Sequence, residues 1–104
     1  MIIYSVTITL DLAIENEWRQ WMEGVHIPDV MKSGYFSESH FHQLLVPEPE
    51  AGVVTYNVQY VCANMADYET YQEKAAPALQ KDHNDRFKGR FVAFRTLLQR
   101  HSSH

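Results

Sequence analysis

The fold is decided by residues 14–34, which read IENEWRQWMEGVHIPDVMKSG. The large apolar side chains of this stretch recur at helical spacing, and most of the acidic and amide side chains fall on the opposite side. We expect a helix over residues 13–25 and then an irregular turn that carries His26, because Pro28 disfavours a helical conformation at the residue before it. Pro28 can then start a short second helical turn that stops at Gly34. The helix bears two indole rings on one face, so it requires a broad apolar partner, which a sheet can supply.

Four further segments have the composition and alternation of β-strands. They are residues 2–10, 36–46, 53–62 and 90–99. Two prolines and a glycine within residues 47–52 predict a turn, so the second and third strands form a hairpin.

The second helical region lies between the third and fourth strands. Asn64, with an acidic residue three positions later, is typical of a helix N-terminal cap, and we expect Asp11 to cap the first helix. Pro77 cannot lie inside an unbroken helix. We therefore predict a break near Ala76 and a second segment that ends near Phe87.

The order strand, helix, strand, strand, helix, strand predicts an α+β, ferredoxin-like βαββαβ domain over residues 1–100, with 101–104 as a polar tail. Right-handed crossovers place both helices on one face of a four-stranded antiparallel sheet, with the first and third strands in its centre. The helix-covered face is expected to hold Tyr4, Val6, Ile8, Phe41, Tyr56, Val58, Tyr60 and Phe94.

The other face of the sheet combines small polar with large apolar side chains. Among those assigned to it are Gln59, Arg95, Ile3, Phe91 and Leu97. A face open to water is normally more charged than this. We therefore predict a homodimer in which two sheets pack face to face as a dimeric α+β barrel; the alternative is a monomer with a hydrated second face.

Composition favours a single cytoplasmic domain. The chain has 104 residues, and no apolar run approaches the length of a membrane span. No basic start followed by an apolar block marks a signal peptide, and Cys62, the only cysteine, cannot form an internal disulfide bond. We therefore expect a cytoplasmic protein without a membrane partner.

The net charge of −4 argues against nucleic acid as a partner. The charge is uneven, because residues 1–80 hold 3 Lys/Arg and 11 Asp/Glu whereas residues 81–104 hold 6 and 2. This asymmetry predicts packing of the last strand against an acidic body, within or between subunits. The alternative is an anion site near Lys81, Arg86, Lys88, Arg90 and Arg95.

Several segments together resemble a small bacterial family of dimeric α+β barrel proteins described only as a domain of unknown function. They are MIIYSVTITLD, EWRQWMEGVHIPDVMKSGYF, TYNVQYVCANMADYETYQ, APALQKDHNDRF and KGRFVAFRTLL, and they cover nearly the whole chain. The resemblance implies a ferredoxin-like subunit, a dimer and no established activity. More distantly, the architecture is similar to dimeric barrels that include cofactor-independent monooxygenases and haem-degrading enzymes; no haem-ligand motif is present, so this comparison is fold analogy.

Two histidines are the candidate catalytic residues. With parallel helices, His26 after the first helix and His83 late in the second lie at the same end of the sheet. The negative helix ends, with Asp29, Asp82 and Asp85 nearby, favour the protonated imidazole. One histidine could then act as a general base near neutral pH; the alternative is that each caps its own helix end.

A pocket between the helices and the sheet is the predicted ligand site. We expect it to bind a small apolar or aromatic molecule through Tyr4, Trp21, Tyr56, Gln59, Tyr60 and Arg95. The rings could equally be core residues with their polar tips at the rim. Arg95 could pair with the amide of Gln59 or Asn57 or with a carboxylate ligand, but a hydrogen bond between subunits is the favoured interpretation.

Neither a metal nor a cofactor is predicted. His40 and His42 share a strand face and could chelate an ion, but zinc sites need three or four convergent ligands. The sequence thus favours a homodimeric protein that binds a small molecule. The alternatives are a cofactor-independent monooxygenase or isomerase with His26 or His83 as general base, and a purely structural dimerisation module.

Overall fold

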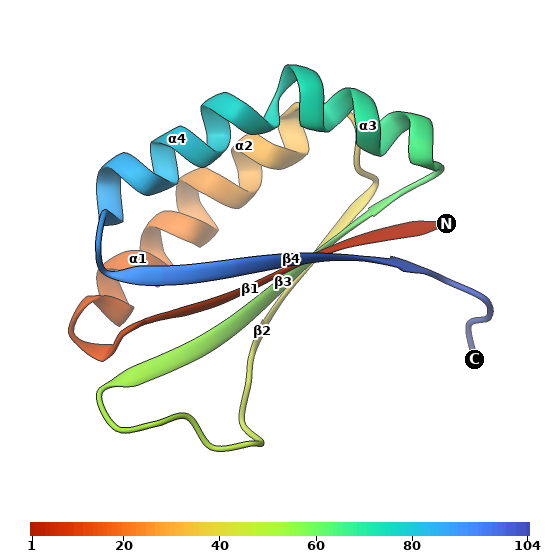
Figure 1. Ribbon diagram of the computed structural model, residues 1–104. Helices are drawn as coiled ribbons and strands as arrows, with labels where there is room; N and C mark the ends of the chain where they lie inside the picture. Colours follow the sequence, from red (N-terminus) through yellow and green to blue (C-terminus); the bar gives the residue numbers. More distant parts are fainter.

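A four-stranded antiparallel sheet forms one layer of the protein, and the helices form a second layer on one of its faces (Figure 1). The computed structural model describes all 104 residues. The strand order is β2-β3-β1-β4, so β1 and β3 are central, and the predicted ferredoxin-like fold is confirmed. The strands are β1 (Ile2–Asp11), β2 (Glu38–Gln43), β3 (Val53–Cys62) and β4 (Phe91–Gln99).

The helical region after β1 is continuous, so the irregular turn predicted at His26 is absent, whereas the short helical segment predicted from Pro28 is present. It runs as a 3₁₀ turn η1 (Leu12–Ile14), α1 (Glu15–Trp21), a π-helical turn η2 (Met22–His26) and α2 (Ile27–Lys32). The expectation of a break before Pro28 was wrong. Instead, Ile27 N–H donates to the Met22 carbonyl five residues back, and this wider turn places Pro28 in the first turn of α2, where its missing N–H is tolerated.

The helical region after β3 is broken as predicted from Pro77. It consists of α3 (Met65–Lys74) and α4 (Ala76–Phe87). The Asn64 side chain accepts a hydrogen bond of 2.9 Å from the Asp67 N–H, which confirms the predicted cap. None of the helices has the length and apolar character needed to span a membrane.

Asp11 does not cap the first helix, contrary to prediction. It is the last residue of β1, and its carboxylate accepts a hydrogen bond of 2.6 Å from Arg90 Nε. This ion pair fastens the end of β1 to the segment that enters β4. The second strand is also shorter than predicted, because Phe36 lies in the core outside the strand pairing.

β4 presents the opposite face to the one predicted. Arg95 pairs in register with Val6, a core residue, so it lies on the helix-covered side, whereas Phe94 is 62% exposed on the open side. Phe91 and Ala93 accordingly pack against the core. The prediction failed because β4 has large apolar side chains on both faces, so its own alternation does not specify which side is buried.

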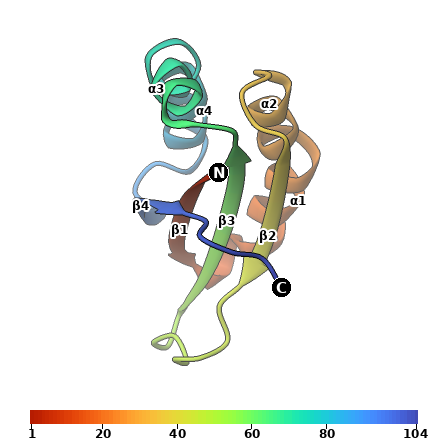
Figure 2. The same cartoon turned by 90° about the vertical axis from the view of Figure 1, so that its right-hand side faces the viewer.

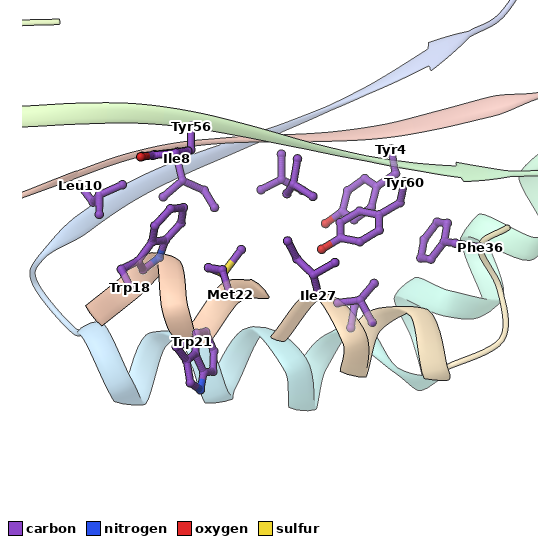
Figure 3. Close-up of a cluster of buried hydrophobic side chains, with 14 of the residues drawn as sticks. Tyr4, Ile8, Leu10, Trp18, Trp21, Met22, Ile27, Phe36, Tyr56 and Tyr60 are labelled. Atoms are coloured by element: carbon purple, nitrogen blue, oxygen red, sulfur yellow. The ribbon is translucent and has the colours of Figure 1, made fainter. Parts of the chain in front are cut away.

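The core lies between the two layers (Figure 3). Trp18 and Met22 lie between the helices and the sheet, and Tyr4 and Tyr60 extend from the sheet toward the helices. Trp18 has no exposed surface. Figure 2 shows the helices as two columns on the same side of the sheet, α1 with α2 and α3 with α4.

The open face of the sheet has a polar centre between apolar side chains. The Asn57 amide donates to Ser5 Oγ at 2.9 Å and to Thr7 Oγ1 at 3.1 Å. Val92 and Phe94 on β4 are 71% and 62% exposed. The mixture predicted for this face is therefore present, although β4 contributes different side chains to it.

Candidate functional site

The structure brings His26 and His83 together between η2 and α4. Their ring centroids lie 5.7 Å apart. The Trp21 ring stacks on His26 at 4.9 Å and 23°, and its centroid lies 5.7 Å from that of His83. π-helical turns occur often at functional sites, and here the turn ends at His26.

A small cavity beside the two histidines reaches the sheet. Its volume is about 30 Å³, and its lining includes His26, His83, Tyr4, Tyr60 and Arg95. This space holds one or two water molecules. It cannot hold an aromatic ring, because pockets for such ligands measure about 300 Å³ or more. Most of the pocket predicted between helices and sheet is therefore filled by side chains.

An open groove between α4 and β4 adjoins the cavity. Its volume is about 580 Å³, and it shares Gln80, Ala93 and Arg95 with the lining of the cavity. Lys88 and Phe91 lie further along the groove. A ligand that lies in the groove could therefore reach the cavity with one functional group.

His83 is held as a neutral ring with a defined tautomer. The buried Trp18 Nε1–H donates to His83 Nε2 at 2.9 Å. An indole N–H can only donate, so Nε2 carries the lone pair and the proton of the neutral ring is on Nδ1. Burial lowers the pKa of His83 to about 4, and the nearby His26 and the positive Arg95 act in the same direction. His83 is therefore uncharged at neutral pH.

His26 is also neutral, but its ring nitrogens form no hydrogen bond with another protein group. Burial lowers its pKa, and this effect exceeds the opposite effect of the Asp29 and Asp82 carboxylates. The predicted preference for the protonated rings was wrong for both histidines. In addition, the helical run does not end at His26, because η2 continues directly into α2 and the run ends at Lys32.

Arg95 is the charged group at the junction of cavity and groove. Its Nε donates to the Tyr4 hydroxyl at 3.0 Å, and it takes part in none of the four ion pairs of the chain. Arg95 does not pair with Gln59, one of the partners considered from the sequence, because Gln59 lies on the open face of the sheet, opposite Ser5 and His40. The guanidinium is therefore available to a ligand.

The predicted ligand residues are only partly brought together. Tyr4, Tyr60 and Arg95 line the cavity, whereas Trp21 lies behind the rings of His26 and His83 and does not line it. Tyr56 lies elsewhere: its hydroxyl donates to Glu15 at 2.7 Å, and burial, together with this carboxylate, raises its pKa to about 12.

The five cationic side chains considered as an anion site near the C-terminus do not converge on one site in the structure. Lys81 forms an ion pair with Asp85, Arg90 pairs with Asp11, and Arg86 lies over the Trp21 ring at 5.5 Å. Of the five cations, only Lys88 and Arg95 line the groove.

Two residues of the site were missed from the sequence. Trp18 was taken only as a core residue, although it orients His83. Gln80 lines both the cavity and the groove. Its position three residues before His83 places the two side chains on the same face of a helix, and this spacing was the available signal.

The two histidines of β2 lie apart from this site. The ring centroids of His40 and His42 are 6.3 Å apart, and His40 Nε2 lies 3.0 Å from the exposed Glu38 carboxylate. No group of three or more His, Cys, Asp or Glu side chains in the chain is arranged to hold a metal ion.

Comparison with solved structures shows the fold class. HapK from Hahella chejuensis superposes with a TM-score of 0.72 at 13% identity, covering 100% of this chain and 96% of that chain. A dimeric ferredoxin-like protein from an uncultured marine organism has a TM-score of 0.67 at 8% identity, covering 100% and 98%. A variant of SnoaB, a cofactor-independent oxygenase from Streptomyces nogalater, has a TM-score of 0.67 at 8% identity, covering 98% and 95%.

At these identities the similarity shows the ferredoxin-like fold alone. No curated protein matches the chain. The family model described as "Domain of unknown function (DUF4286)" matches residues 1–101, and the chain therefore belongs to this family of unknown function.

Proposed function

We propose that the protein binds a small acidic molecule with a flat apolar body. The body lies in the groove between α4 and β4, and the acidic group lies at Arg95. The observation that carries this proposal is the position of Arg95 at the junction of cavity and groove, without a carboxylate partner. Because Nε is engaged by Tyr4, the terminal amino groups of the guanidinium remain for the ligand.

The surroundings of Arg95 support an anionic ligand. His26 and His83 are neutral, so Arg95 is the charged side chain that lines the cavity. In the groove, Lys88 adds a second positive charge, and the Asp85 carboxylate is paired with Lys81. Phe91 and Ala93 supply apolar surface in the groove. The earlier expectation of an aromatic ligand is retained for the body of the molecule, but the size of the cavity places that body in the groove.

Tryptophan fluorescence titration with salicylate tests the proposal, with the neutral salicylamide as comparison ligand. We expect salicylate to bind more tightly than salicylamide. Arg95→Met should weaken salicylate binding at least about tenfold, since a hydrogen bond to a charged group contributes about 1.5–3 kcal/mol. Arg100→Met, at the exposed chain end, is the matched control and should bind as the wild type does. Equal affinity of Arg95→Met and wild type would contradict the proposal.

A second candidate function is proton-transfer catalysis without a cofactor. The favouring observation is His26, a neutral imidazole whose ring nitrogens are not engaged by the protein and whose ring lies 5.7 Å from that of His83. Such a group is available as a general base at neutral pH. The SnoaB neighbour, described as a cofactor-independent oxygenase, shows that the fold can carry such chemistry.

We also propose that the protein forms a homodimer through the open face of the sheet. Val92, Phe94 and Leu98 of β4 expose apolar surface there. Large exposed apolar patches usually mark contacts with another protein. A structural neighbour is described as a dimeric ferredoxin-like protein, which supports a second copy of this chain as the partner. If this dimerisation is the whole function of the chain, salicylate should not bind at Arg95.

A further inference from the structure

We propose that the site catalyses keto–enol isomerisation of a 2-oxo acid, with His26 as the base, His83 as the hydrogen-bond donor to the carbonyl oxygen and Trp18 as the positioning residue for His83. This inference rests on the proposed function, since it requires an acidic ligand at Arg95. It assigns different roles to two residues of the same type. The assignment follows from the contacts of each ring.

The contacts of His83 make it a donor. Trp18, which has no exposed surface, donates its indole N–H to Nε2 at 2.9 Å and thereby occupies the lone pair of the ring. Phe91 packs edge-on against the same imidazole, with centroids 4.1 Å apart. The ring is thus held from two sides. Nδ1–H is the group that His83 can offer to a ligand.

The contacts of His26 leave it free to act as a base. Its ring stacks on Trp21, which fixes the plane of the imidazole without engaging a nitrogen. The charged and titratable groups that face it come from three elements: Asp29 on α2, Asp82 and His83 on α4, and Arg95 on β4. Burial outweighs the two carboxylates, so the lone pair of His26 is available at neutral pH.

The spacing of the two rings suits one reacting group between them. The separation of 5.7 Å between the ring centroids brings both imidazoles to one reacting group, so that His83 can contact the carbonyl oxygen while His26 contacts the adjacent carbon. The cavity of about 30 Å³ accepts a carbonyl group and excludes a ring. In a 2-oxo acid the carbonyl adjoins the carboxylate, so both groups can reach their partners while the remainder lies in the groove.

The proposed step needs no co-reactant. His26 takes a proton from the carbon next to the carbonyl, and that C–H bond breaks. Its electron pair forms the carbon–carbon double bond, and the carbonyl π pair moves to oxygen, where Arg95 and His83 Nδ1–H stabilise the negative charge. Protonated His26 then gives the proton to this oxygen. The product is the enol isomer, and His26 is neutral again.

Proton exchange of phenylpyruvate in D₂O, followed by ¹H NMR, tests the assignment. The wild type should accelerate loss of the methylene signal, and His26→Asn should lower the catalysed rate by about 100-fold or more. His42→Asn, on the exposed edge strand, is the matched control and should exchange at the wild-type rate. Full exchange activity in His26→Asn would overturn the assignment.

The positioning role of Trp18 is tested by the tautomer of His83. A Trp18 side chain that only filled the core would not affect this tautomer. In the wild type, ¹⁵N NMR should show His83 in the neutral Nδ1–H tautomer, and Trp18→Phe should lose this preference and slow exchange. A wild-type His83 in the Nε2–H tautomer would overturn the proposal whatever the stability of the variant.

The isomerase and the binding function can fail separately. Arg95-dependent salicylate binding without accelerated exchange would refute the isomerase and leave the proposed binding function standing. Absence of salicylate binding would refute the binding function itself.

Discussion

At the scale of single residues, burial decides the charge of the site. Burial removes an imidazolium from water and thereby lowers the pKa values of both histidines. At His26 this effect exceeds the opposite effect of Asp29 and Asp82, and at His83 the neighbouring His26 and Arg95 act in the same direction as burial. The hydrogen bond from Trp18 acts in the same sense, because a nitrogen that accepts from an indole cannot also carry a proton. Arg95 is left as the fixed charge of the cavity.

The lowered pKa of His83 predicts acid sensitivity of the folded state. Its pKa is about 4 in the folded protein against an ordinary value of 6.5, so the unfolded chain binds the proton first as the pH falls. The neutral His83 ring of the folded state therefore contributes to the free energy of unfolding. This contribution is fully present above about pH 6.5 and decreases toward pH 4, by roughly 3 kcal/mol in total.

Urea denaturation between pH 7 and pH 4 measures this effect. His83→Gln should show a shallower loss of stability over the range than the wild type, and the exposed His42→Gln should keep the wild-type slope. Identical pH profiles for the wild type and His83→Gln would show that His83 is not protected from protonation.

At the scale of elements, two prolines show when a helix break can be predicted from the sequence and when it cannot. Pro77 predicted the break between α3 and α4, because a helix interior cannot accommodate its ring. Pro28 predicted a break that is absent, since the chain widens into the π turn η2 instead. The local rule states that a proline removes a donor. Whether the helix breaks or widens depends on packing, and here Met22 and Ile27 remain buried on either side of the turn.

The orientation of β4 marks another limit of sequence reasoning. Apolar residues occur on both of its faces, so only the register with β1 decides that Arg95, rather than Phe94, faces the helices. The two histidines were predicted to lie together because topology alone sets their position. The junction at Arg95 was not predicted, because it depends on that register.

Removal of the Asn64 cap tests how much the start of α3 contributes to stability. Asn64→Ala removes the side-chain acceptor at the start of α3, and it should lower the free energy of unfolding by about 1 kcal/mol. Thermal unfolding should show a decrease of about 4–8 °C in Tm for a domain of this size. Asn84→Ala, an exposed change inside α4, is the control and should not lower Tm. An unchanged Tm in Asn64→Ala would show that the cap contributes nothing.

At the scale of the whole molecule, the two faces of the sheet carry different features. The helix-covered face, which includes Tyr4 and Arg95, holds the cavity and borders the groove, and the open face carries the exposed apolar side chains of β4. The groove lies at the β4 edge of the sheet. The proposed ligand site and the proposed dimer interface can therefore be tested with separate substitutions.

A charge on the open face should dissociate the proposed dimer. Phe94→Glu places a carboxylate in the expected interface, and light scattering at micromolar concentration should then report the mass of one 12.1 kDa chain, where the wild type reports twice that mass. Val25→Glu, at an exposed site on the outer side of η2, should remain dimeric. A monomeric wild type would refute the dimer.

Titration of the wild-type protein with salicylate, followed by ¹H–¹⁵N NMR, locates the acidic ligand that we propose at Arg95. The largest saturable shifts should occur at Gln80, Ala93 and Arg95, where cavity and groove meet. Shifts centred on Asn57 and Gln59, on the opposite face of the sheet, or no saturable shifts at all, would contradict it.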